Sequence, residues 1–234
     1  MAFAVFDLRH PFAYFRYGVT FRMKFFACSR VGVALVAAAV FVSTAGTLRA
    51  EVTGNTNIAS ATGSDALLSA AILSGPGERY RLRLHHLHTG EDLDVVYKVG
   101  NQYVPTALAQ LNHFLRDHRT EDVSHYDPKE FDVLHQVMTK LGKPNGIIDI
   151  VCGYRTPWSN NFLRTRSAVT GVAEHSQHML AKAIDIRVAG VRTRTLRDVA
   201  LSLHEGGVGY YPTSQFVHVD VGPVRTWSFG GRGD

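Results

Sequence analysis

The amino-acid sequence predicts an α+β fold in which helices pack on a small, mostly antiparallel sheet. Three observations predict it. Two segments with helical spacing of apolar residues come early in the folded part of the chain, most of the short strand-like segments come after them, and two strand-like segments flank a tight turn. Helices first and short strands later are typical of this class, whereas strict alternation would indicate a parallel sheet.

The first predicted element is a β-hairpin over residues 80–99. Residues change character alternately along Tyr80–Leu87, turn-forming residues occupy 88–92, and Leu93–Val99 resumes the strand pattern. Alternating side chains lie on opposite faces of a strand, so two such runs around a short turn indicate a hairpin.

Helices and further strands follow the hairpin. The spacing of apolar residues predicts helices over 105–115, 127–141 and 195–204, and the first two begin with a proline, which the first helical turn tolerates. Four short strands are also predicted: Ile147–Val151, Ala183–Val188, Gly207–Tyr211 and Phe216–Val221.

Residues 1–50 have the features of a secretory signal peptide. Val31–Val42 carries no charge, basic residues precede it and small residues follow it, which is the order found in such signals. A dozen apolar residues are fewer than the ~20 that span a bilayer. We therefore expect cleavage and no stable membrane span afterwards, with an uncleaved anchor as the alternative. Met23 begins a signal of ordinary length, which favours translation from that residue.

Two parts follow the leader. Residues 51–77 are rich in small and polar residues and contain few large apolar ones, which predicts a linker with at most a short helix around Asp65–Leu73. Residues 78–234 then form the folded domain.

The charge distribution argues against a nucleic-acid partner. Of the 25 Lys and Arg residues six lie in residues 1–50, and of the 20 Asp and Glu residues one lies there, which leaves 19 of each sign in residues 51–234. A neutral body without runs of Lys or Arg lacks the basic surface that binds a nucleic-acid backbone.

The exported part has one thiol. Cys28 precedes the apolar run and Cys152 is the only other cysteine, so no intramolecular disulfide forms after export. Stability must then come from the core or from a metal ion.

Two polar patterns in the strand-rich half indicate a metal site. The first is Ser176-x-His178-x6-Asp185, and the second, 33 residues after Asp185, is His218-x-Asp220. A straight helix would separate His178 and Asp185 by about 10 Å at 1.5 Å per residue, and a straight strand would place them on opposite faces. Shared ligation therefore requires a turn over 178–182 that leads into the strand of Asp185. His218 and Asp220 share one strand face.

This set of side chains has two interpretations. Two histidines and a carboxylate on neighbouring strands match the three-ligand shell of a catalytic zinc ion with one open position. A charged aspartate inside an apolar strand is otherwise costly to bury. The alternative is that these residues are hydrogen-bonded polar groups at strand edges.

Ordered motifs between Tyr80 and Trp227 resemble those of the M15-type zinc peptidases. The matching segments are His88-Thr89-Gly90-Glu91, Leu115-Arg116-Asp117-His118-Arg119, Gly153-Tyr154-Arg155-Thr156-Pro157-x2-Asn160, Gly171-Val172-Ala173-x2-Ser176-x-His178-Met179, Ala183-Ile184-Asp185, Gly206-Gly207-Val208-Gly209-Tyr210-Tyr211 and Phe216-Val217-His218-Val219-Asp220-x-Gly222. This family includes D-Ala-D-Ala carboxypeptidases and murein endopeptidases and shares its fold with the hedgehog signalling domain. The sequence is most similar to the murein endopeptidase branch, formerly known only as a domain of unknown function.

The resemblance implies a zinc peptidase domain over residues 78–234, with the hedgehog and D-Ala-D-Ala-peptidase fold. By this resemblance His178, Asp185 and His218 are the zinc ligands. Arg155 matches the arginine that meets the substrate carbonyl in the carboxypeptidases, where a fixed guanidinium donates to the oxyanion as it develops. Ala181 stands where glycine is usual after the first ligand, so a left-handed backbone there would be strained.

The general base departs from the family pattern. Gln215 stands where the carboxypeptidases have a glutamate, and Asp220 stands where other members have a second histidine. Asp220 is therefore our candidate for the catalytic group that takes or steers the proton of the water. Two alternatives stay open: Asp220 orients a ligand histidine, or His175 or Glu174 takes the proton.

Tyr154, Ser176 and Tyr211 are the candidate substrate-binding residues. Tyr154 and Tyr211 belong to a group of aromatic residues that would line a groove for a peptide. Ser176 would hydrogen-bond within the metal loop, and it is a poor nucleophile because no separate His/Asp pair is left to activate it.

The sequence and the resemblance together predict an exported, periplasmic murein endopeptidase that uses Zn²⁺ to hydrolyse the peptide cross-links of peptidoglycan. Its partners are the stem peptides of the cell wall. Two alternatives are a DD- or LD-carboxypeptidase on wall peptides and a non-catalytic, zinc-containing wall-binding module.

Overall fold

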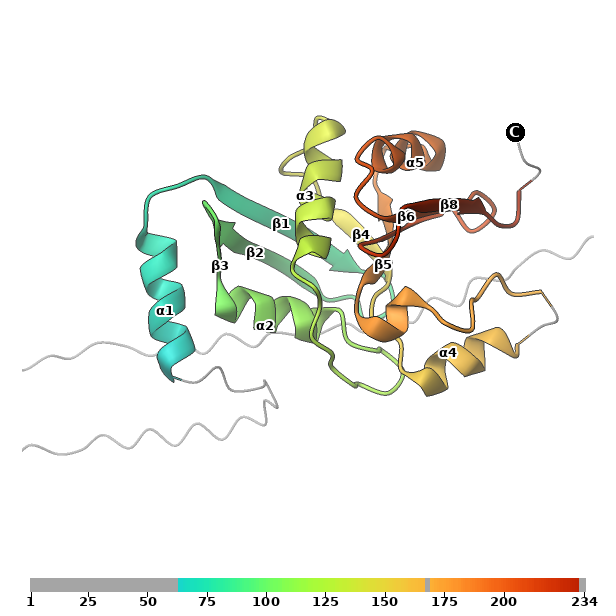
Figure 1. The fold of residues 1–234 in the computed structure, drawn as a ribbon, viewed down its shortest axis with the longest axis horizontal. Coiled ribbons are helices and arrows are strands. Elements are labelled where there is room, and N and C mark those ends of the chain that lie inside the picture. Colours follow the sequence, from blue (N-terminus) through green and yellow to red (C-terminus); the bar gives the residue numbers. More distant parts are fainter. Residues whose placement is uncertain (1–62, 167–168, 232–234) are drawn as a thin grey trace, which may run out of the picture. The chain divides into compact units, whose positions relative to one another are not determined.

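The computed structural model describes residues 63–166 and 169–231 (Figure 1). The predicted signal peptide, its alternative start at Met23 and residues 51–62 of the predicted linker lie outside these described residues. The division of the chain into leader, linker and folded domain stays a prediction.

The described strands form one mixed sheet. In chain order they are β1 (Arg79–His86), β2 (Asp92–Val99), β3 (Gln102–Tyr103), β4 (Ile148–Cys152), β5 (Ala183–Val188), β6 (Gly207–Tyr211), β7 (Phe216–Asp220) and β8 (Arg225–Ser228). Their order across the sheet is β3-β2-β1-β4-β5-β7-β6-β8. Only β1 with β4 and β6 with β8 are parallel. The predicted α+β class and mostly antiparallel pairing are confirmed, although with eight strands the sheet is larger than expected.

The helices are α1 (Gly63–Ser74), α2 (Pro105–Phe114), α3 (Lys129–Lys140), α4 (Pro157–Arg164) and α5 (Thr193–Leu201), with a short 3₁₀ helix, η1 (Gln177–Leu180). The helices expected over 105–115, 127–141 and 195–204 are confirmed as α2, α3 and α5, and the short helix expected around 65–73 is α1. Helix α4 was not predicted. Its start carried a readable signal, because Thr156 accepts a hydrogen bond from the Ser159 amide and Pro157 follows it.

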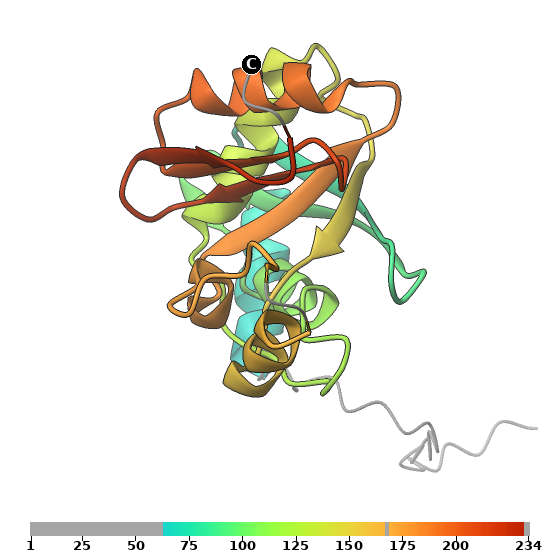
Figure 2. The ribbon, with the colours of Figure 1, turned by 90° about the vertical axis from the view of Figure 1, so that its right-hand side faces the viewer.

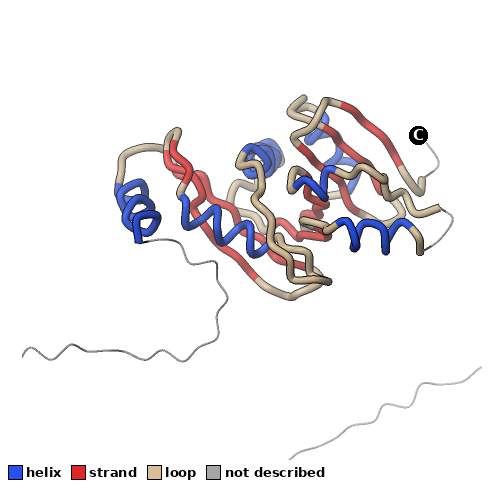
Figure 3. The backbone as a smooth tube through the Cα atoms, turned by 60° about the horizontal axis from the view of Figure 1, so that its bottom comes forward, coloured by secondary structure: helices blue, strands red, loops and turns tan. Residues whose placement is uncertain are grey.

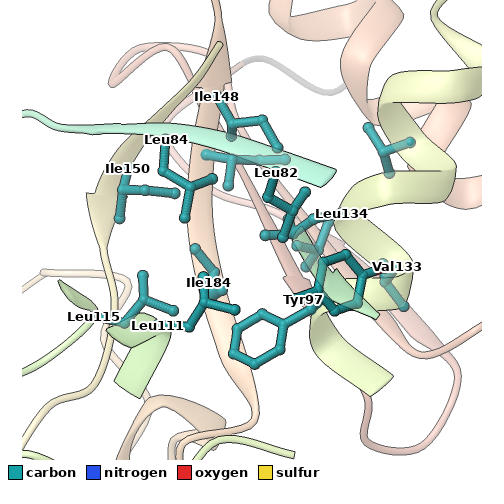
Figure 4. Close-up of a cluster of buried hydrophobic side chains, with 14 of the residues drawn as sticks. Leu82, Leu84, Tyr97, Leu111, Leu115, Val133, Leu134, Ile148, Ile150 and Ile184 are labelled. Carbon is teal, nitrogen blue, oxygen red and sulfur yellow. The ribbon is translucent and has the colours of Figure 1, made fainter. Parts of the chain in front are cut away.

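One face of the sheet is apolar and covered by helices. Helix α3 packs on β1 and against α5, which contacts β5, β6 and β7. The core that forms there includes Leu82, Leu84, Ile148, Ile150 and Ile184, all nearly inaccessible to solvent (Figure 4). Because strand residues alternate between faces, Asp185 lies on the opposite face from its neighbours Ile184 and Ile186.

The two faces of the sheet have different neighbours. Helix α5 lies on one side of β6 and β8, whereas α4 and η1 lie on the other side (Figures 1 and 2). The tube view shows a long loop between the two short helices, which contrasts with the tight turn between β1 and β2 (Figure 3). The polar face therefore adjoins loops and short helices, which is where binding residues are commonly found.

Glu130, in the first turn of α3, is an unusual feature of the core. It is fully buried, and neither carboxyl oxygen has a hydrogen-bond partner within the described part of the chain. Burial raises its pKa well above the ordinary value, and the charges of Asp220, Asp127 and Asp185 raise it further. Glu130 is therefore a neutral carboxylic acid in the folded protein.

This state predicts a pH dependence of stability. In the unfolded chain Glu130 ionises above about pH 4.3, whereas the folded chain keeps the proton, so the free energy of unfolding should fall as pH rises, by up to about 1.4 kcal/mol per pH unit until the folded pKa is reached. Glu130→Gln should remove this decline and be more stable than the wild type at pH 7–8 but not at pH 4. Urea unfolding at several pH values measures it. Exposed Glu205→Gln is the control, and an unchanged slope in Glu130→Gln would contradict the assignment.

Candidate active site

A cavity of about 840 Å³ opens on the polar side of the sheet. Its lining includes eight residues that the sequence pattern or the resemblance singled out: Arg155, Glu174, His175, Ser176, His178, Asp185, Tyr211 and His218. These residues come from the β4–α4 turn, the segment around η1, and strands β5, β6 and β7. The fold thus brings together residues that lie up to 63 positions apart in the sequence.

Local structure explains how His178 reaches the cavity. Ser176 begins η1 by accepting a hydrogen bond from the His178 amide, and Ala181 ends it in the left-handed conformation, with φ 50° and ψ 46°. The turn predicted over 178–182 is confirmed, and it leads directly into β5. The strained alanine costs of order 1–2 kcal/mol, which the surrounding structure must offset.

Three atoms converge at the floor of the cavity. Asp185 and His218 are paired residues of β5 and β7, and His178 enters from η1. His178 Nε2 lies 3.2 Å from Asp185 Oδ1 and 3.1 Å from His218 Nδ1, and His218 Nδ1 lies 3.0 Å from Asp185 Oδ1. A tetrahedral zinc ion with bonds of about 2.0–2.1 Å needs ligand atoms about 3.3 Å apart, so the triangle has the required size.

The other nitrogen of each imidazole is hydrogen-bonded on the side away from these three atoms. His178 Nδ1 lies 2.7 Å from the carbonyl oxygen of Gly153, and His218 Nε2 lies 2.9 Å from Asp220 Oδ2. Both partners accept, so each of these nitrogens carries the proton of a neutral ring. The converging atoms are then three lone pairs, an arrangement that favours a cation between them.

The ionisation states of His178 and Asp185 agree with this donor set, whereas hydrogen bonds to Asp185 and Asp220 outweigh burial and raise the pKa of His218. A bound cation would oppose protonation of that ring. Burial lowers the pKa of His178 to about 4, and the charge of Arg155 lowers it further, so the ring is neutral near pH 7. Burial alone would raise the pKa of Asp185, but the two facing histidines outweigh burial and hold that pKa well below its ordinary value. A neutral imidazole and a carboxylate are the forms that bind a metal ion.

A second donor set overlaps the first. Cys152 lies opposite Asp185 in the β4–β5 pairing, and its sulfur, His178 and Asp185 also lie close enough together to hold an ion. Burial raises the pKa of the Cys152 thiol to about 12, however, and metals bind the thiolate. His218 offers a lone pair at 3.0–3.1 Å from both other donors and is therefore the better third ligand.

Arg155 is held beside these donors by several contacts. Its amide donates to the His178 carbonyl and its Nη2 donates to Ser176 Oγ at 3.1 Å. Buried Asp117 accepts hydrogen bonds from the amide and the hydroxyl of Thr156, which fixes the turn after Arg155. Nε of Arg155 is buried without a partner in residues 63–166 and 169–231, so the guanidinium retains an unused donor. No role was predicted for Asp117.

Asp220 has a full set of hydrogen-bond donors. Its Oδ1 accepts from the amides of Gly207 and Gly222 and from Arg225 Nη1, and its Oδ2 accepts from Arg225 Nη2 and His218 Nε2. Burial would raise its pKa, but the hydrogen bonds from His218 and Arg225 outweigh burial and hold the pKa well below the ordinary value. A buried carboxylate so occupied is a weak base, and these contacts favour the alternative in which Asp220 orients His218. Arg225 was not among the predicted site residues.

Of the remaining residues named from the sequence, Tyr211 lines the cavity, whereas Tyr154 and Gln215 do not. Tyr211 lines the cavity and accepts a hydrogen bond from Trp227 Nε1. Tyr154 is not among the described residues that line it, so the geometry gives no support to a substrate-binding role. Gln215 lies in the β6–β7 turn and lines a different cavity of about 490 Å³.

Comparison with known proteins gives the family. Residues 75–227 match the family described as peptidoglycan L,D-endopeptidase MepK. The chain belongs to this family. The MepK family is the murein endopeptidase branch of the M15-type peptidases, so the predicted family is confirmed.

Curated relatives agree with the MepK assignment. A probable peptidoglycan L,D-endopeptidase MepK from Haemophilus influenzae is 43% identical over 157 residues, which cover 67% of this chain and 83% of the relative. The peptidoglycan L,D-endopeptidase MepK of Escherichia coli K12 is 43% identical over 159 residues, covering 67% of this chain and 84% of the relative. No solved structure matches.

Within the described residues, no helix is long and apolar enough to cross a membrane.

The two overlapping donor sets predict opposite results for two variants of this MepK family member. If His178, Asp185 and His218 hold the ion, His218→Ala should lose the bound metal, whereas Cys152→Ala should keep one ion per chain. Metal content after dialysis, measured by mass spectrometry with circular dichroism as the folding control, distinguishes them. Metal loss in Cys152→Ala alone would make Cys152 the ligand.

Proposed function

We propose that this protein is a zinc-dependent endopeptidase of the bacterial cell wall, exported to the periplasm, that hydrolyses the peptide cross-links of peptidoglycan. The observation that carries the proposal is the convergence of three lone pairs, from His178, Asp185 and His218, on the floor of a cavity that Arg155 also lines. The names of the relatives add the bond class, an L,D cross-link, and the predicted signal peptide of residues 1–50 adds the location.

The ion and its neighbours have separate tasks. A bound zinc ion supplies Lewis acidity, which activates a water molecule and polarises the scissile carbonyl. Arg155 donates to the oxygen of that carbonyl as negative charge develops on it, and its contacts with Ser176 and the Thr156 turn hold it in place before substrate arrives. Ser176 acts through Arg155 and through the start of η1 and not as a nucleophile.

The proton of the attacking water goes to a residue other than Asp220. Asp220 is fully hydrogen-bonded and lies on the side of His218 that faces away from the other two ligands. Of the alternatives considered, Glu174 and His175 both line the cavity and are exposed, so either is accessible to a bound substrate. We assign Asp220 to the orientation of His218 and the proton transfer to Glu174 or His175.

Digestion of purified muropeptides tests the function. The fragment 51–234 should convert cross-linked dimers with an L,D bond into monomers; a chelator should abolish the reaction and zinc should restore it. Mass analysis of the products identifies the bond. Release of terminal residues alone would indicate a carboxypeptidase, and zinc binding without cleavage would indicate a wall-binding module.

Replacement of Arg155 tests its role at the oxyanion. Arg155→Gln should lower kcat by about 10²–10³-fold, the usual effect of removing one oxyanion donor, while zinc content stays at one per chain. Arg155→Lys should recover part of the loss because it restores the charge without the planar fork. A change confined to KM would show that Arg155 binds substrate without stabilising the transition state.

Two matched variants identify the proton acceptor. Loss of a general base costs about 10²–10⁴-fold in rate, so either Glu174→Gln or His175→Asn should show a fall of that size with normal zinc content, and the other should not. Steady-state rates on the same dimer make the comparison. If neither variant is impaired, the assignment of the proton transfer to this segment is wrong.

A further inference from the structure

Strand β6 has no side chains at two positions on the cavity side of the sheet. It lies between β7 and β8, where Gly207 pairs with Arg225 and Gly209 pairs with both His218 and Trp227. A Cβ atom on Gly209 would lie 2.6 Å from ring carbons of Trp227, and one on Gly207 would lie 2.4 Å from Arg225 Nη1. Neither glycine has a positive φ, so what requires glycine here is the space that two side chains of β8 occupy.

Arg225 uses this space to reach across β6. Its guanidinium makes two hydrogen bonds to the Asp220 carboxylate, at 3.1 and 2.7 Å, and Asp220 in turn accepts from His218 Nε2 at 2.9 Å. The Asp220 side chain is fully buried, whereas the Arg225 side chain is 40% exposed. Arg225 therefore supplies the counter-charge that allows a carboxylate to stay ionised behind a ligand histidine.

Trp227 occupies the second gap. The Trp227 indole lies against the His218 ring, with ring centroids 5.0 Å apart. The Arg225 guanidinium lies 4.9 Å from the centroid of the same indole. Its Nε1 donates to the hydroxyl of Tyr211 at 3.0 Å. Each of four residues thus contacts the next: His218 contacts Asp220, Asp220 contacts Arg225, Arg225 contacts Trp227, and Trp227 contacts His218.

We propose that Arg225 and Trp227 are positioning residues for His218. Gly207 and Gly209 leave the space through which these two side chains of β8 reach Asp220 and His218. The proposal rests on the proposed function, in which His218 binds the metal ion. Asp220 fixes the outer edge of the imidazole and Trp227 fixes its face, so the ring has one orientation in which Nδ1 faces His178 and Asp185. Without Arg225, the buried Asp220 carboxylate would lose two of its hydrogen bonds. The acceptor of His218 Nε2 would then no longer be held in one position.

Zinc affinity of purified full-length variants tests the proposal, with kcat and KM on cross-linked muropeptides as the second readout. Partners that orient a metal ligand typically contribute 10–100-fold to metal affinity. Arg225→Gln is expected to weaken zinc binding by about 10–100-fold and to lower kcat more than KM at saturating zinc. Arg225→Lys, which keeps the charge but not the two-pronged geometry, should fall between Arg225→Gln and the wild type.

The control is a second arginine pair on the same sheet. Arg81 donates to both oxygens of Asp94 between β1 and β2, away from the cavity, so Arg81→Gln should leave zinc affinity and rates unchanged. Cobalt substitution adds a spectroscopic readout, because the visible absorption of bound Co²⁺ reports ligand geometry and should change in Arg225→Gln but not in Arg81→Gln.

Trp227 variants keep the proposal testable if Arg225→Gln does not fold. Trp227→Phe should retain most of the zinc affinity and Trp227→Ala should weaken it, as should Gly209→Ala, which displaces the indole. Arg225→Gln or Trp227→Ala variants that are folded, bind zinc as tightly as the wild type and show the same cobalt spectrum would overturn the proposal. A wild type that binds no zinc and cleaves no dimer would instead overturn the proposed function.

Discussion

Three lone pairs that face one another inside the protein are the constraint on which the rest of this structure depends. His178 Nε2, Asp185 Oδ1 and His218 Nδ1 lie 3.0–3.2 Å apart, and the proton of each imidazole is held on its other side by Gly153 and Asp220. Without a cation this arrangement would leave buried acceptors facing one another, which is unfavourable. In the proposed function, these outward hydrogen bonds leave the two histidines and the aspartate with lone pairs available to a metal ion.

The sheet supplies the rigidity that such a site needs. Asp185 alternates along β5 with Ile184 and Ile186, which are inaccessible in the core, so the carboxylate cannot shift without disturbing apolar packing on the opposite face. His218 lies directly across from it on β7, with Val217 and Val219 anchored in the same way. Only His178 and Arg155 come from turns, and these two turns are tied to each other by the hydrogen bond from the Arg155 amide to the His178 carbonyl.

The sequence predicted the parts of the site that depend on local pattern. The turn over 178–182 followed from the spacing of His178 and Asp185, and the shared face of His218 and Asp220 followed from the period of a strand. The pattern left Asp220 open as a base or as the residue that orients a ligand histidine. Its five donors come from Gly207, Gly222, Arg225 and His218 and are counted only once the strand order β7-β6-β8 is known. Strand β8 itself is largely exposed and has one apolar residue, Trp227, so it lacks the burial pattern that identifies a strand.

One rule explains why buried carboxyl groups close to one another have opposite ionisation states. Asp220 is buried, yet it stays ionised because His218, Arg225 and the amides of Gly207 and Gly222 direct donors at its oxygens. Glu130, in the first turn of α3, has no such donors in the described structure and already faces the negative charge of Asp220 and Asp185, so its pKa rises and it remains neutral. For these two carboxyl groups the number of donors, and not the depth of burial, therefore decides the ionisation state. The charge of Asp220 is balanced by Arg225, whereas the carboxylate of Asp185 faces His178, His218 and the cavity.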